Sequence, residues 1–381
     1  MVWIVESIIS TFLIALGLSQ LASTLAGYRG GSLVGAKRWA GLILSLGLFL
    51  GGAWLLPQSL YVLIWVPLTA LLAFGLLLLA GSFIAPPLHP NTLFQPEHPA
   101  HGGCRQVKIP DGAGETPGYL LLPPCTQGED KVRAAVCLVH GAGDHKTFFK
   151  WPIIRTLLAE GFAVLTIDLP GHGDYRHRPL IYPDCMPTIP AAVHFLREEL
   201  RISHIGLVGI SLGGAMVINA AAQYFLAHGR HLVEALVVME TPTHLNFTRA
   251  LFYREAWNTF YGAPILSLLR ETTLKQVRDD WRTGGYRGSH TVAELFDLLN
   301  PLQYIQGLTS LPILLVYSRG DCIAPPEQAE ALRQAAPHAQ WLESKKASHV
   351  TLTLIPEINQ QLASWLKDQF MREQVEVKSK E

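Results

Sequence analysis

The sequence predicts an α/β domain built on a doubly wound, mostly parallel β-sheet with a helical cap insertion, preceded by an all-α region of about three helices. From about residue 105 to residue 370, short apolar runs rich in Val, Ile and Leu alternate with segments of helical character. Such continuous apolar strands are typical of a parallel sheet that is buried on both faces. Right-handed crossovers between parallel strands then place helices on both sides of the sheet.

Three apolar stretches without charged residues occupy the N-terminus, over residues 7–26, 39–56 and 60–85. At about 1.5 Å per helical residue, the second would be about 27 Å long and the third about 39 Å. A bilayer core of roughly 30 Å needs about 20 apolar residues, and the sequence therefore predicts a transmembrane anchor over residues 1–85. A signal peptide is an alternative interpretation of the first stretch, and a buried helical pair is the alternative for all three.

Positive charge predicts how this anchor is oriented. Arg29, Lys37 and Arg38 lie between the first two stretches, whereas the second connection carries no charge. The positive-inside rule places these three residues in the cytoplasm, and two further crossings return the rest of the chain to the same side. We therefore expect an integral membrane protein with a cytoplasmic C-terminal domain. The Pro-rich residues 86–104 form an extended linker in front of that domain.

The domain over residues 105–370 begins with two short strands around a Gly-rich turn and continues as alternating strands and helices. A proline in the first turn favours the helix from residue 190, and alanines favour the helix from residue 212. The predicted strands cover residues 106–109, 118–123, 134–139, 162–167, 204–210, 233–239, 312–317 and 340–342. The predicted helices cover residues 151–160, 190–200, 212–226, 326–335 and 355–370.

One interval, residues 241–301, breaks this alternation. It is about sixty residues long, has helical character and is rich in Phe, Tyr and Trp. Loops of this length between two strands are uncommon, so the sequence predicts a small cap subdomain whose aromatic residues partly line the surface beneath it. The final residues, 371–381, are mostly charged, and we expect them to form a flexible tail.

Composition and charge exclude some classes of protein. Charged residues make up 16% of the 381 residues and hydrophobic residues 49%. Typical soluble domains carry about 25% charged residues, which supports the expectation that part of the chain does not face water. The 30 basic residues balance the 30 acidic residues, and no basic cluster is present. The sequence therefore predicts no nucleic-acid partner.

The five cysteines are dispersed, at positions 104, 125, 137, 185 and 322. They form no C-x-x-C pair and no metal-ligand spacing with histidine. An odd and scattered set favours a reducing compartment over a disulfide scaffold. We expect free thiols and no metal; Cys104 and Cys125, which flank the predicted hairpin, are the pair that could be joined in an oxidising space.

The segment Gly209-Ile210-Ser211-Leu212-Gly213 joins a predicted strand to a predicted Ala-rich helix. In this G-x-S-x-G pattern the serine occupies a sharp strand-to-helix turn with a strained backbone, where side chains at the two glycine positions would clash. The turn lifts the hydroxyl beside a helix N-terminus, which favours developing negative charge. Ser211 is therefore a candidate nucleophile; an ordinary strand-to-helix turn is the alternative.

On these residues the chain, from about 105 to 370, resembles the α/β-hydrolase superfamily. In that family an oxyanion-forming loop follows an earlier strand, and this chain carries His140 and Gly141 there, followed by Ala142. The resemblance implies that the backbone N–H groups of Ala142 and Leu212 bind the oxyanion. It also implies that His140 braces the loop and does not react.

Two further segments extend the resemblance. Residues 168–174, with the sequence Asp-Leu-Pro-Gly-His-Gly-Asp, are similar to the D-x-x-G-x-G turn of the family, and Tyr175 follows where a serine is common. We interpret this turn as structural. The hairpin that opens the domain and the run from residue 300 to residue 325 resemble the dienelactone-hydrolase and prolyl-oligopeptidase-like branches.

The resemblance also implies the partners of the serine. The sequence Ser-Arg-Gly-Asp after Tyr317 resembles the acid turn of the family, so Asp321 is the implied acid, and His349, after the last short strand, is the implied base. An imidazole titrates near neutral pH and can take and return the proton of the serine, while a carboxylate fixes its tautomer. Glu240, at the end of an earlier strand, is the alternative acid. The rival histidines, none of which follows the last strand, are His172, His177 and His194.

Together these residues predict a membrane-anchored serine hydrolase that cleaves carboxylic ester or thioester bonds through an acyl-enzyme intermediate on Ser211. The lipid bilayer and a small or lipid-like acyl substrate are the expected partners, and no cofactor is expected. A serine peptidase of the same fold and a catalytically silent, membrane-bound interaction module are the alternatives. A metal-dependent hydrolase lacks a ligand cluster here, and a dinucleotide site lacks the third glycine in register.

Overall fold

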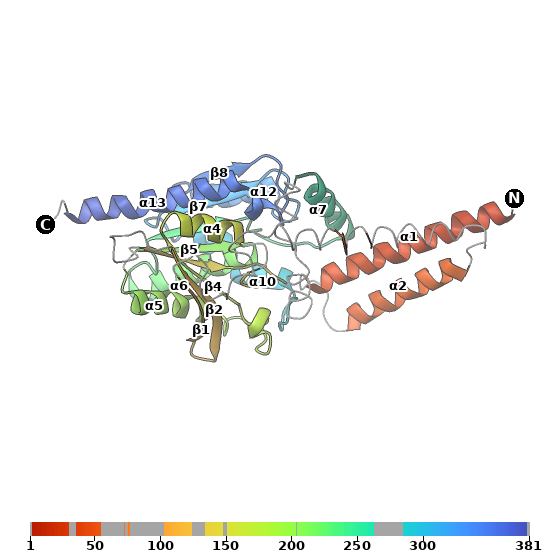
Figure 1. The fold of residues 1–381 in the computed structure, drawn as a ribbon, viewed down its shortest axis with the longest axis horizontal. Coiled ribbons are helices and arrows are strands. Elements are labelled where there is room, and N and C mark those ends of the chain that lie inside the picture. Colours follow the sequence, from red (N-terminus) through yellow and green to blue (C-terminus); the bar gives the residue numbers. More distant parts are fainter. Residues whose placement is uncertain are drawn as a thin grey trace.

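The computed structural model describes residues 2–29, 36–54, 72, 75–76, 103–123, 134–147, 151–202, 204–262 and 285–378. An eight-stranded sheet forms the centre of the larger part of the molecule, and a pair of helices extends from one side of it (Figure 1). The strand order is β1-β2-β4-β3-β5-β6-β7-β8. The strands have these bounds: β1 Gly103–Pro110, β2 Glu115–Leu122, β3 Ala134–Val139, β4 Ala163–Ile167, β5 His204–Ile210, β6 Ala235–Met239, β7 Ile313–Ser318 and β8 Gln340–Ser344.

The sheet is mostly parallel, as the apolar strands predicted. β1 pairs with β2, and β2 with β4, in antiparallel register. All pairs from β4 through β3, β5, β6 and β7 to β8 are parallel. The inner parallel strands β3, β4, β6 and β7 are fully buried and mostly apolar, as expected for strands with helices on both faces. The predicted doubly wound α/β class is therefore confirmed.

Helices cover the two faces of the sheet in two layers. The helices of the sheet domain have these bounds: α4 Trp151–Ala159, α5 Thr188–Leu200, α6 Leu212–His228, α12 Pro326–Ala335 and α13 Pro356–Lys378. Alternate residues of β3 belong to two separate buried clusters: Ala135, Cys137 and Val139 to one, Ala134, Val136 and Leu138 to the other. The first cluster includes residues of α5, α6 and α12, and the second includes residues of α4 and α13. This alternation follows from the two-residue period of a strand.

The predicted cap contains helices in the part that the structure describes. They are α7 Arg249–Gly262, α10 Val292–Leu299 and α11 Pro301–Ile305, and two short 3-10 turns occur elsewhere, η2 Gly173–Tyr175 and η3 Leu352–Leu354. Residues 263–284 of the predicted cap lie outside the described residues. Helix α10 begins with a capping box between Thr291 and Glu294, a motif that satisfies two backbone N–H groups of the first turn.

The C-terminal tail differs from the expectation of a flexible segment. Helix α13 continues to Lys378, so most of the predicted tail over residues 371–381 is helical. The reason is local: the tail is rich in Met, Arg, Glu, Gln and Lys, which all have high helix propensity.

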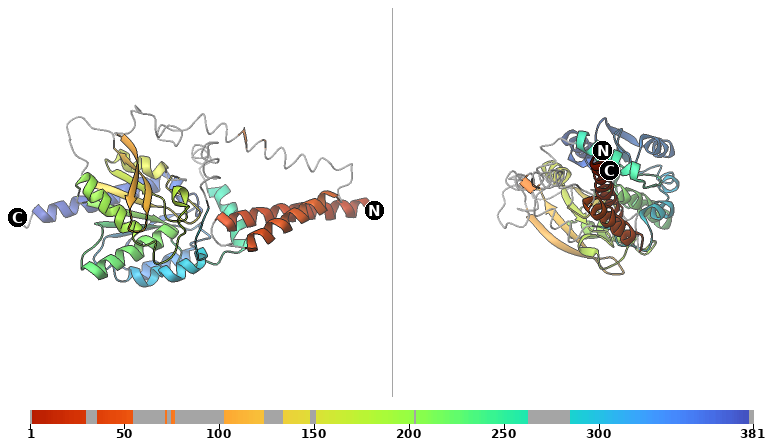
Figure 2. Two further views of the ribbon diagram at one scale, coloured as in Figure 1. Left: turned by 90° about the horizontal axis from the view of Figure 1, so that it is seen from below. Right: turned by 90° about the vertical axis from the view of Figure 1, so that its right-hand side faces the viewer.

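The N-terminal region is a hairpin of two helices, α1 over Val2–Arg29 and α2 over Ala36–Trp54. The hairpin extends away from the sheet, at the opposite end of the molecule from the end of α13 (Figures 1 and 2). The Ser10 hydroxyl of α1 donates to the carbonyl oxygen of Gly52 on α2 at 2.6 Å. A Cβ at Gly52 would lie 2.9 Å from the Ser10 carbonyl oxygen. The small residue therefore permits the close approach of the two helices.

The predicted localisation as an integral membrane protein is wrong, and no transmembrane anchor is found in the described part of residues 1–85. No helix in the described part of the chain is both long and apolar enough to cross a bilayer. Helix α2 has 19 residues and begins with Ala-Lys-Arg, which leaves an apolar part of about 24 Å against a bilayer core of roughly 30 Å. In α1 the polar Ser10, Gln20 and Thr24 are buried within protein.

The predicted orientation and the predicted bilayer partner depended on this anchor. Two further predictions concern residues outside the described ranges. The cytoplasmic orientation inferred from Arg29, Lys37 and Arg38 required a membrane-spanning segment and therefore has no support. For the same reason the lipid bilayer is no longer an expected partner. The third apolar stretch lies almost wholly outside the described residues. The same is true of the predicted linker up to residue 102, because β1 begins at Gly103.

The described cysteines are free thiols, at positions 104, 137, 185 and 322. Burial raises the pKa of the Cys137 thiol to about 12, so this thiol is not a nucleophile at neutral pH. Cys125, the suggested partner of Cys104, lies outside the described residues.

Candidate active site

Ser211 occupies the sharp turn between β5 and α6. Its backbone has φ +53° and ψ −119°, a left-handed conformation that L-residues rarely adopt. Its N–H group donates to the Met239 carbonyl oxygen at 2.9 Å, and its own carbonyl oxygen accepts the N–H group of Gly214 at 2.9 Å. These bonds to β6 and to the first turn of α6 hold the strained residue in place.

The glycines that flank Ser211 are required by crowding. A Cβ at Gly209 would lie 2.5 Å from Cγ2 of Val217, and a Cβ at Gly213 would lie 2.5 Å from the His140 carbonyl oxygen. Both distances are far inside van der Waals contact, and at Gly213 the obstacle is rigid backbone. The tight turn thereby packs the helix start directly against the loop that follows β3.

Asp321 lies in the turn after β7 and is held by backbone amides. Its side chain is buried, with 2% of the residue exposed. One oxygen, Oδ1, accepts the N–H groups of Ile323 at 2.7 Å and of Ala324 at 2.8 Å. The other oxygen, Oδ2, lies 2.7 Å from Nδ1 of His349. The two amides leave Oδ2 aimed at the imidazole.

His349 joins the carboxylate to the serine. Its Nε2 atom lies 2.9 Å from Oγ of Ser211, and its Nδ1 atom faces Asp321 as described. With Nδ1 as the donor to the carboxylate, Nε2 is free of a proton and can accept one from the hydroxyl. The structure thus brings Ser211, His349 and Asp321, which are distant in sequence, into one hydrogen-bonded chain. Their catalytic roles remain a prediction.

Glu240, the alternative acid, lies at the same site. It follows β6 directly, is fully buried and has φ +48°. A carboxylate oxygen of Glu240, one of Asp321 and a ring nitrogen of His349 all lie within 4.8 Å of one another. These are metal-binding residue types. Both ring nitrogens of His349 are nevertheless engaged, by Asp321 and by Ser211, so the group is better suited to proton transfer than to a cation.

The loop after β3 lies against the serine. A Cβ at Gly141 would lie 3.1 Å from Cβ of Ser211, so Ala142 follows immediately beside the nucleophile. Leu212 is the first residue of α6. The His140 ring lies with Nδ1 at 2.8 Å from the Gly141 carbonyl oxygen, and its Nε2 accepts the N–H group of Leu169 at 3.0 Å. The ring therefore joins two loops, and the bracing role implied for His140 stays a prediction.

The Asp-x-x-Gly-x-Gly segment forms a buried polar network with no contact to the reactive atoms in the described structure. Asp168 accepts the Lys146 ammonium at 2.5 Å and the N–H group of Asp174 at 2.9 Å. The Tyr175 hydroxyl, at the position where the family has a serine, donates to Asp111 Oδ2 at 2.8 Å. Asp111 lies in the turn between β1 and β2, so Tyr175 ties the antiparallel hairpin to this segment.

Three polar residues of the cap helix α7 also reach the site, and the sequence analysis did not single them out. Glu255 accepts the N–H group of Cys322 at 3.1 Å, Asn258 donates to the Gly320 carbonyl oxygen at 2.7 Å, and the Thr259 and Ser348 hydroxyl oxygens lie 2.8 Å apart. The only signal in the sequence is their spacing on one helix face, which is uninformative until the partner of that face is known.

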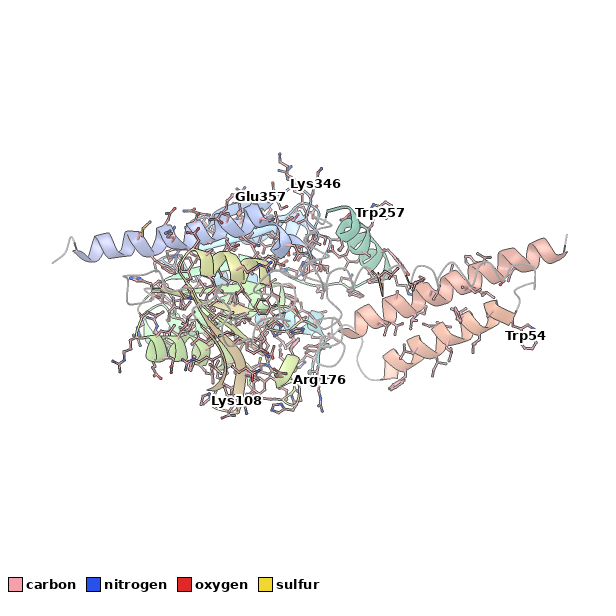
Figure 3. The ribbon with its side chains drawn as sticks, in the orientation of Figure 1. Trp54, Lys108, Arg176, Trp257, Lys346 and Glu357 are labelled. Atoms are coloured by element: carbon pink, nitrogen blue, oxygen red, sulfur yellow. The ribbon has the colours of Figure 1, made fainter. Side chains whose placement is uncertain are left out.

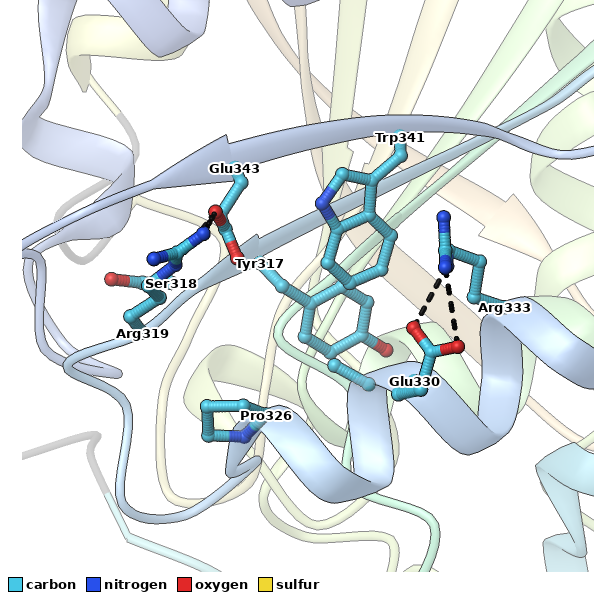
Figure 4. Close-up of a pocket in the computed structure, with 9 residues that line it drawn as sticks. Tyr317, Ser318, Arg319, Pro326, Glu330, Arg333, Trp341 and Glu343 are labelled. Atoms are coloured by element: carbon cyan, nitrogen blue, oxygen red, sulfur yellow. Dashed lines mark hydrogen bonds and ion pairs between the residues drawn. The ribbon is translucent and has the colours of Figure 1, made fainter.

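A cavity of about 350 Å³ is lined by residues of β7, β8 and α12 (Figure 4). The stacked rings of Tyr317 and Trp341 line it, with centroids 5.4 Å apart. Its rim carries two ion pairs at 2.8 Å, Arg319 with Glu343 and Arg333 with Glu330. Neither Ser211 nor His349 lines this cavity, so it is separate from the candidate active site.

Comparison with known proteins supports the same fold. The family described as alpha/beta hydrolase fold matches residues 134–263. The alpha/beta hydrolase psoB of Aspergillus fumigatus is 32% identical over 130 residues, which are 30% of this chain and 29% of that protein. The chain thus spans less than a third of the length of the first curated relatives it matches.

Two longer similarities agree. The pimeloyl-[acyl-carrier protein] methyl ester esterase of Nitrosomonas europaea is 23% identical over 247 residues, which are 58% of this chain and 90% of that protein. The solved structure of DcsB with a substrate analogue superposes with a TM-score of 0.53 at 17% identity, covering 70% of this chain and 99% of that one. With the strand order above, these findings show that the chain has the α/β-hydrolase fold. Its assignment to the dienelactone-hydrolase or prolyl-oligopeptidase-like branch stays a prediction.

Proposed function

We propose that this protein is a serine hydrolase that cleaves carboxylic ester or thioester bonds, with Ser211 as nucleophile, His349 as base and Asp321 as acid. The observation that carries the proposal is the hydrogen-bonded chain from Ser211 Oγ to His349 Nε2 at 2.9 Å and from His349 Nδ1 to Asp321 Oδ2 at 2.7 Å. A serine hydroxyl is a weak nucleophile until a base removes its proton, and this chain supplies the base together with the group that orients it.

The reaction follows from these distances. His349 Nε2 takes the hydroxyl proton as Ser211 Oγ bonds to the acyl carbon, and Asp321 stabilises the resulting imidazolium. The imidazolium then gives the proton to the leaving alcohol or thiol, and the acyl-enzyme remains. His349 then takes a proton from a water molecule, whose oxygen attacks the acyl carbon. The carboxylic acid product leaves, and His349 returns the proton to Ser211 Oγ. The backbone N–H groups of Ala142 and Leu212 are the proposed donors to the oxyanion.

Ester substrates are the first choice for one reason. The relative from Nitrosomonas europaea carries the name of a methyl ester esterase. Trp257 of α7, labelled in Figure 3, is 64% exposed and projects from the helix, and the Tyr253 hydroxyl is hydrogen-bonded to Ser19 of α1, so neither side chain is assigned to the substrate surface.

The test is labelling with a fluorophosphonate probe together with turnover of p-nitrophenyl butyrate, in wild type, Ser211→Ala and His349→Ala. We expect labelling and turnover in wild type alone, with the probe mapped to Ser211. Ser211→Ala should leave the thermal unfolding midpoint nearly unchanged, because it removes one partly exposed hydroxyl. That result separates loss of chemistry from loss of fold.

Two outcomes would overturn the proposal. A folded wild type that neither labels nor turns over the ester would remove the assignment as a hydrolase. Labelling that persists in Ser211→Ala would move the nucleophile elsewhere. A peptide anilide measured in parallel decides the bond type, since a higher kcat/KM on the anilide than on the ester would favour a peptidase.

A further inference from the structure

We infer that helix α7 of the cap holds the acid turn and the base loop in register, and that Glu255, Asn258 and Thr259 are positioning residues for Asp321 and His349. This inference rests on the proposed function, because it assigns these residues a role in the same site. It assigns the described part of the cap a role in organising the site.

The three residues share one face of α7. They are spaced as i, i+3 and i+4, which places their side chains on neighbouring turns of the same side of a helix. Next to them, Ala256 and Trp257 are exposed. The inner face of the helix, which carries Glu255, Asn258 and Thr259, is polar, whereas an ordinary packing face would be apolar. Its polar side chains bind the acid turn and the base loop.

The first two residues bind the acid turn on both sides of Asp321. Asn258 Nδ2 donates to the carbonyl oxygen of Gly320 at 2.7 Å, and Glu255 Oε2 accepts the N–H group of Cys322 at 3.1 Å. These are the residues immediately before and after Asp321. Two bonds that flank a residue in this way restrict rotation of its backbone, and hence the direction in which its carboxylate points.

The third residue binds the base loop. The Thr259 and Ser348 hydroxyl oxygens lie 2.8 Å apart, and Ser348 immediately precedes His349. The Ser348 N–H group also donates to Thr351 Oγ1 at 2.9 Å, so the loop is closed on itself. Because the same helix holds the acid turn, α7 relates the position of His349 to that of Asp321.

Glu255 adds an electrostatic contribution. The residue is 6% exposed, and burial raises the pKa of its carboxyl group, with nearby Asp321 acting in the same direction and His349 in the opposite one. Within the described residues, the charged or titratable groups near the imidazole are Asp321, Glu240 and Glu255, with Arg254 beside Cys322. An ionised Glu255 favours the imidazolium form of His349.

The experiment compares Glu255→Gln, Asn258→Ala and the pair Thr259→Val and Thr259→Ser with wild type. Ala256→Ser, at an exposed position of the same helix, is the matched control. Two readouts are measured across pH: kcat and KM on p-nitrophenyl butyrate, and the imidazole NMR titration of His349, assigned with His349→Ala. Circular dichroism verifies the folded state of each variant.

We expect Asn258→Ala and Thr259→Val to lower kcat by about five- to tenfold, the effect of one lost hydrogen bond, with KM nearly unchanged. Thr259→Ser should restore kcat because it keeps the hydroxyl. Glu255→Gln should move the acid limb of the kcat profile, and the titration midpoint of His349, to lower pH. The Ala256→Ser control should match wild type in both readouts.

Failure of this inference is distinguishable from failure of the proposed function. If wild type hydrolyses the ester but all inner-face variants match Ala256→Ser, α7 does not position the site. If wild type lacks turnover, the proposed hydrolase fails, yet the His349 titration still decides: an unchanged midpoint in Glu255→Gln overturns the inference. If one inner-face variant fails to fold, the other inner-face variants are still compared with Ala256→Ser.

Discussion

Two of the buried carboxyl groups near His349, those of Asp321 and Glu240, follow strands of the sheet, and their surroundings differ. Asp321 accepts two backbone N–H groups through Oδ1 and faces His349 Nδ1 through Oδ2. Glu240 lies within 4.8 Å of both partners. The two amide bonds fix Oδ1 of Asp321 and thereby hold Oδ2 towards the imidazole, as a base-orienting acid requires.

We therefore expect Asp321→Asn to reduce kcat on p-nitrophenyl butyrate roughly 10³- to 10⁴-fold, because an amide cannot hold His349 in the correct tautomer. Glu240→Gln should reduce it by about tenfold or less, the effect of a change in the local field without loss of the orienting bond. Steady-state kinetics of both variants check this ranking. The reverse ranking would make Glu240 the acid.

His172 affects the pH dependence of the folded state's stability. Its ring is fully buried, and its Nδ1 lies 2.9 Å from the Pro170 carbonyl oxygen. Burial lowers its pKa to about 4, from an ordinary value of 6.5. The unfolded chain therefore binds a proton at a higher pH than the folded chain does, so the folded state loses stability as the pH falls from 6.5 towards 4.

The depressed pKa predicts a loss of roughly 3 kcal/mol in the free energy of unfolding over that range, with little further loss from this group below it. Urea unfolding of wild type at steps between pH 7 and pH 4 measures the slope. His172→Asn, which keeps a donor near Pro170 but does not titrate, should have a flatter profile. Parallel profiles for the two proteins would show that His172 is not the titrating group.

At the scale of elements, the loop after β4 anchors the cap at its second end. The Arg287 N–H group donates to the Gly171 carbonyl oxygen at 3.0 Å, and the Leu180 N–H group donates to the Arg287 carbonyl oxygen at 2.9 Å. Gly171 has φ +78°, and a Cβ there would lie 2.0 Å from the Arg287 carbonyl oxygen. The glycine is thus required both by backbone conformation and by this close approach.

Gly171→Ala should therefore lower the free energy of unfolding by about 2–4 kcal/mol, more than strain alone explains. Gly229→Ala is the matched control, since Gly229 has φ +66° with no atom near its missing Cβ, and it should cost only about 1–2 kcal/mol. Guanidinium unfolding of both variants gives the comparison. Equal losses would mean that the return of the cap adapts to the added methyl group.

Across the whole molecule, α7 connects the sheet domain to the N-terminal hairpin. The Tyr253 hydroxyl is hydrogen-bonded to Ser19 of α1, and the Arg249 guanidinium donates to Gln20 of the same helix. On its other face the same helix holds the acid turn and the base loop. In Figure 1, α7 lies between α1 and the sheet, so the cap helix is the physical link between the two parts of the molecule.

The N-terminal hairpin is also where the sequence analysis failed. Apolar composition predicted a membrane anchor, and none of the described helices can cross a bilayer. Composition does not reveal which partner an apolar face contacts. Ser10, Gln20 and Thr24 are buried in the hairpin, and the glycines that let α1 and α2 approach are visible as a packing device only when both helices are placed.

The sequence predicts some features of the candidate site and not others. The positions of Ser211, Asp321 and His349 at strand ends were predictable, because parallel strands bring their carboxyl ends to one edge of a sheet. The bonds from α7 were not, since they join residues 62 to 89 positions apart across the cap. A periodic pattern indicates that Glu255, Asn258 and Thr259 share a face, but not what that face contacts.

By itself the sequence determined the α/β class, the alternation of strands and helices, and the tight turn at Ser211. Each of these depends on short-range properties: apolar runs, helix propensity and the absence of side chains at Gly209 and Gly213. Only the tertiary structure decided the surroundings of the site, the role of α7 and the character of the N-terminal hairpin. Those depend on contacts between distant segments, whose free energy arises from burial and hydrogen bonding that no local window of sequence contains.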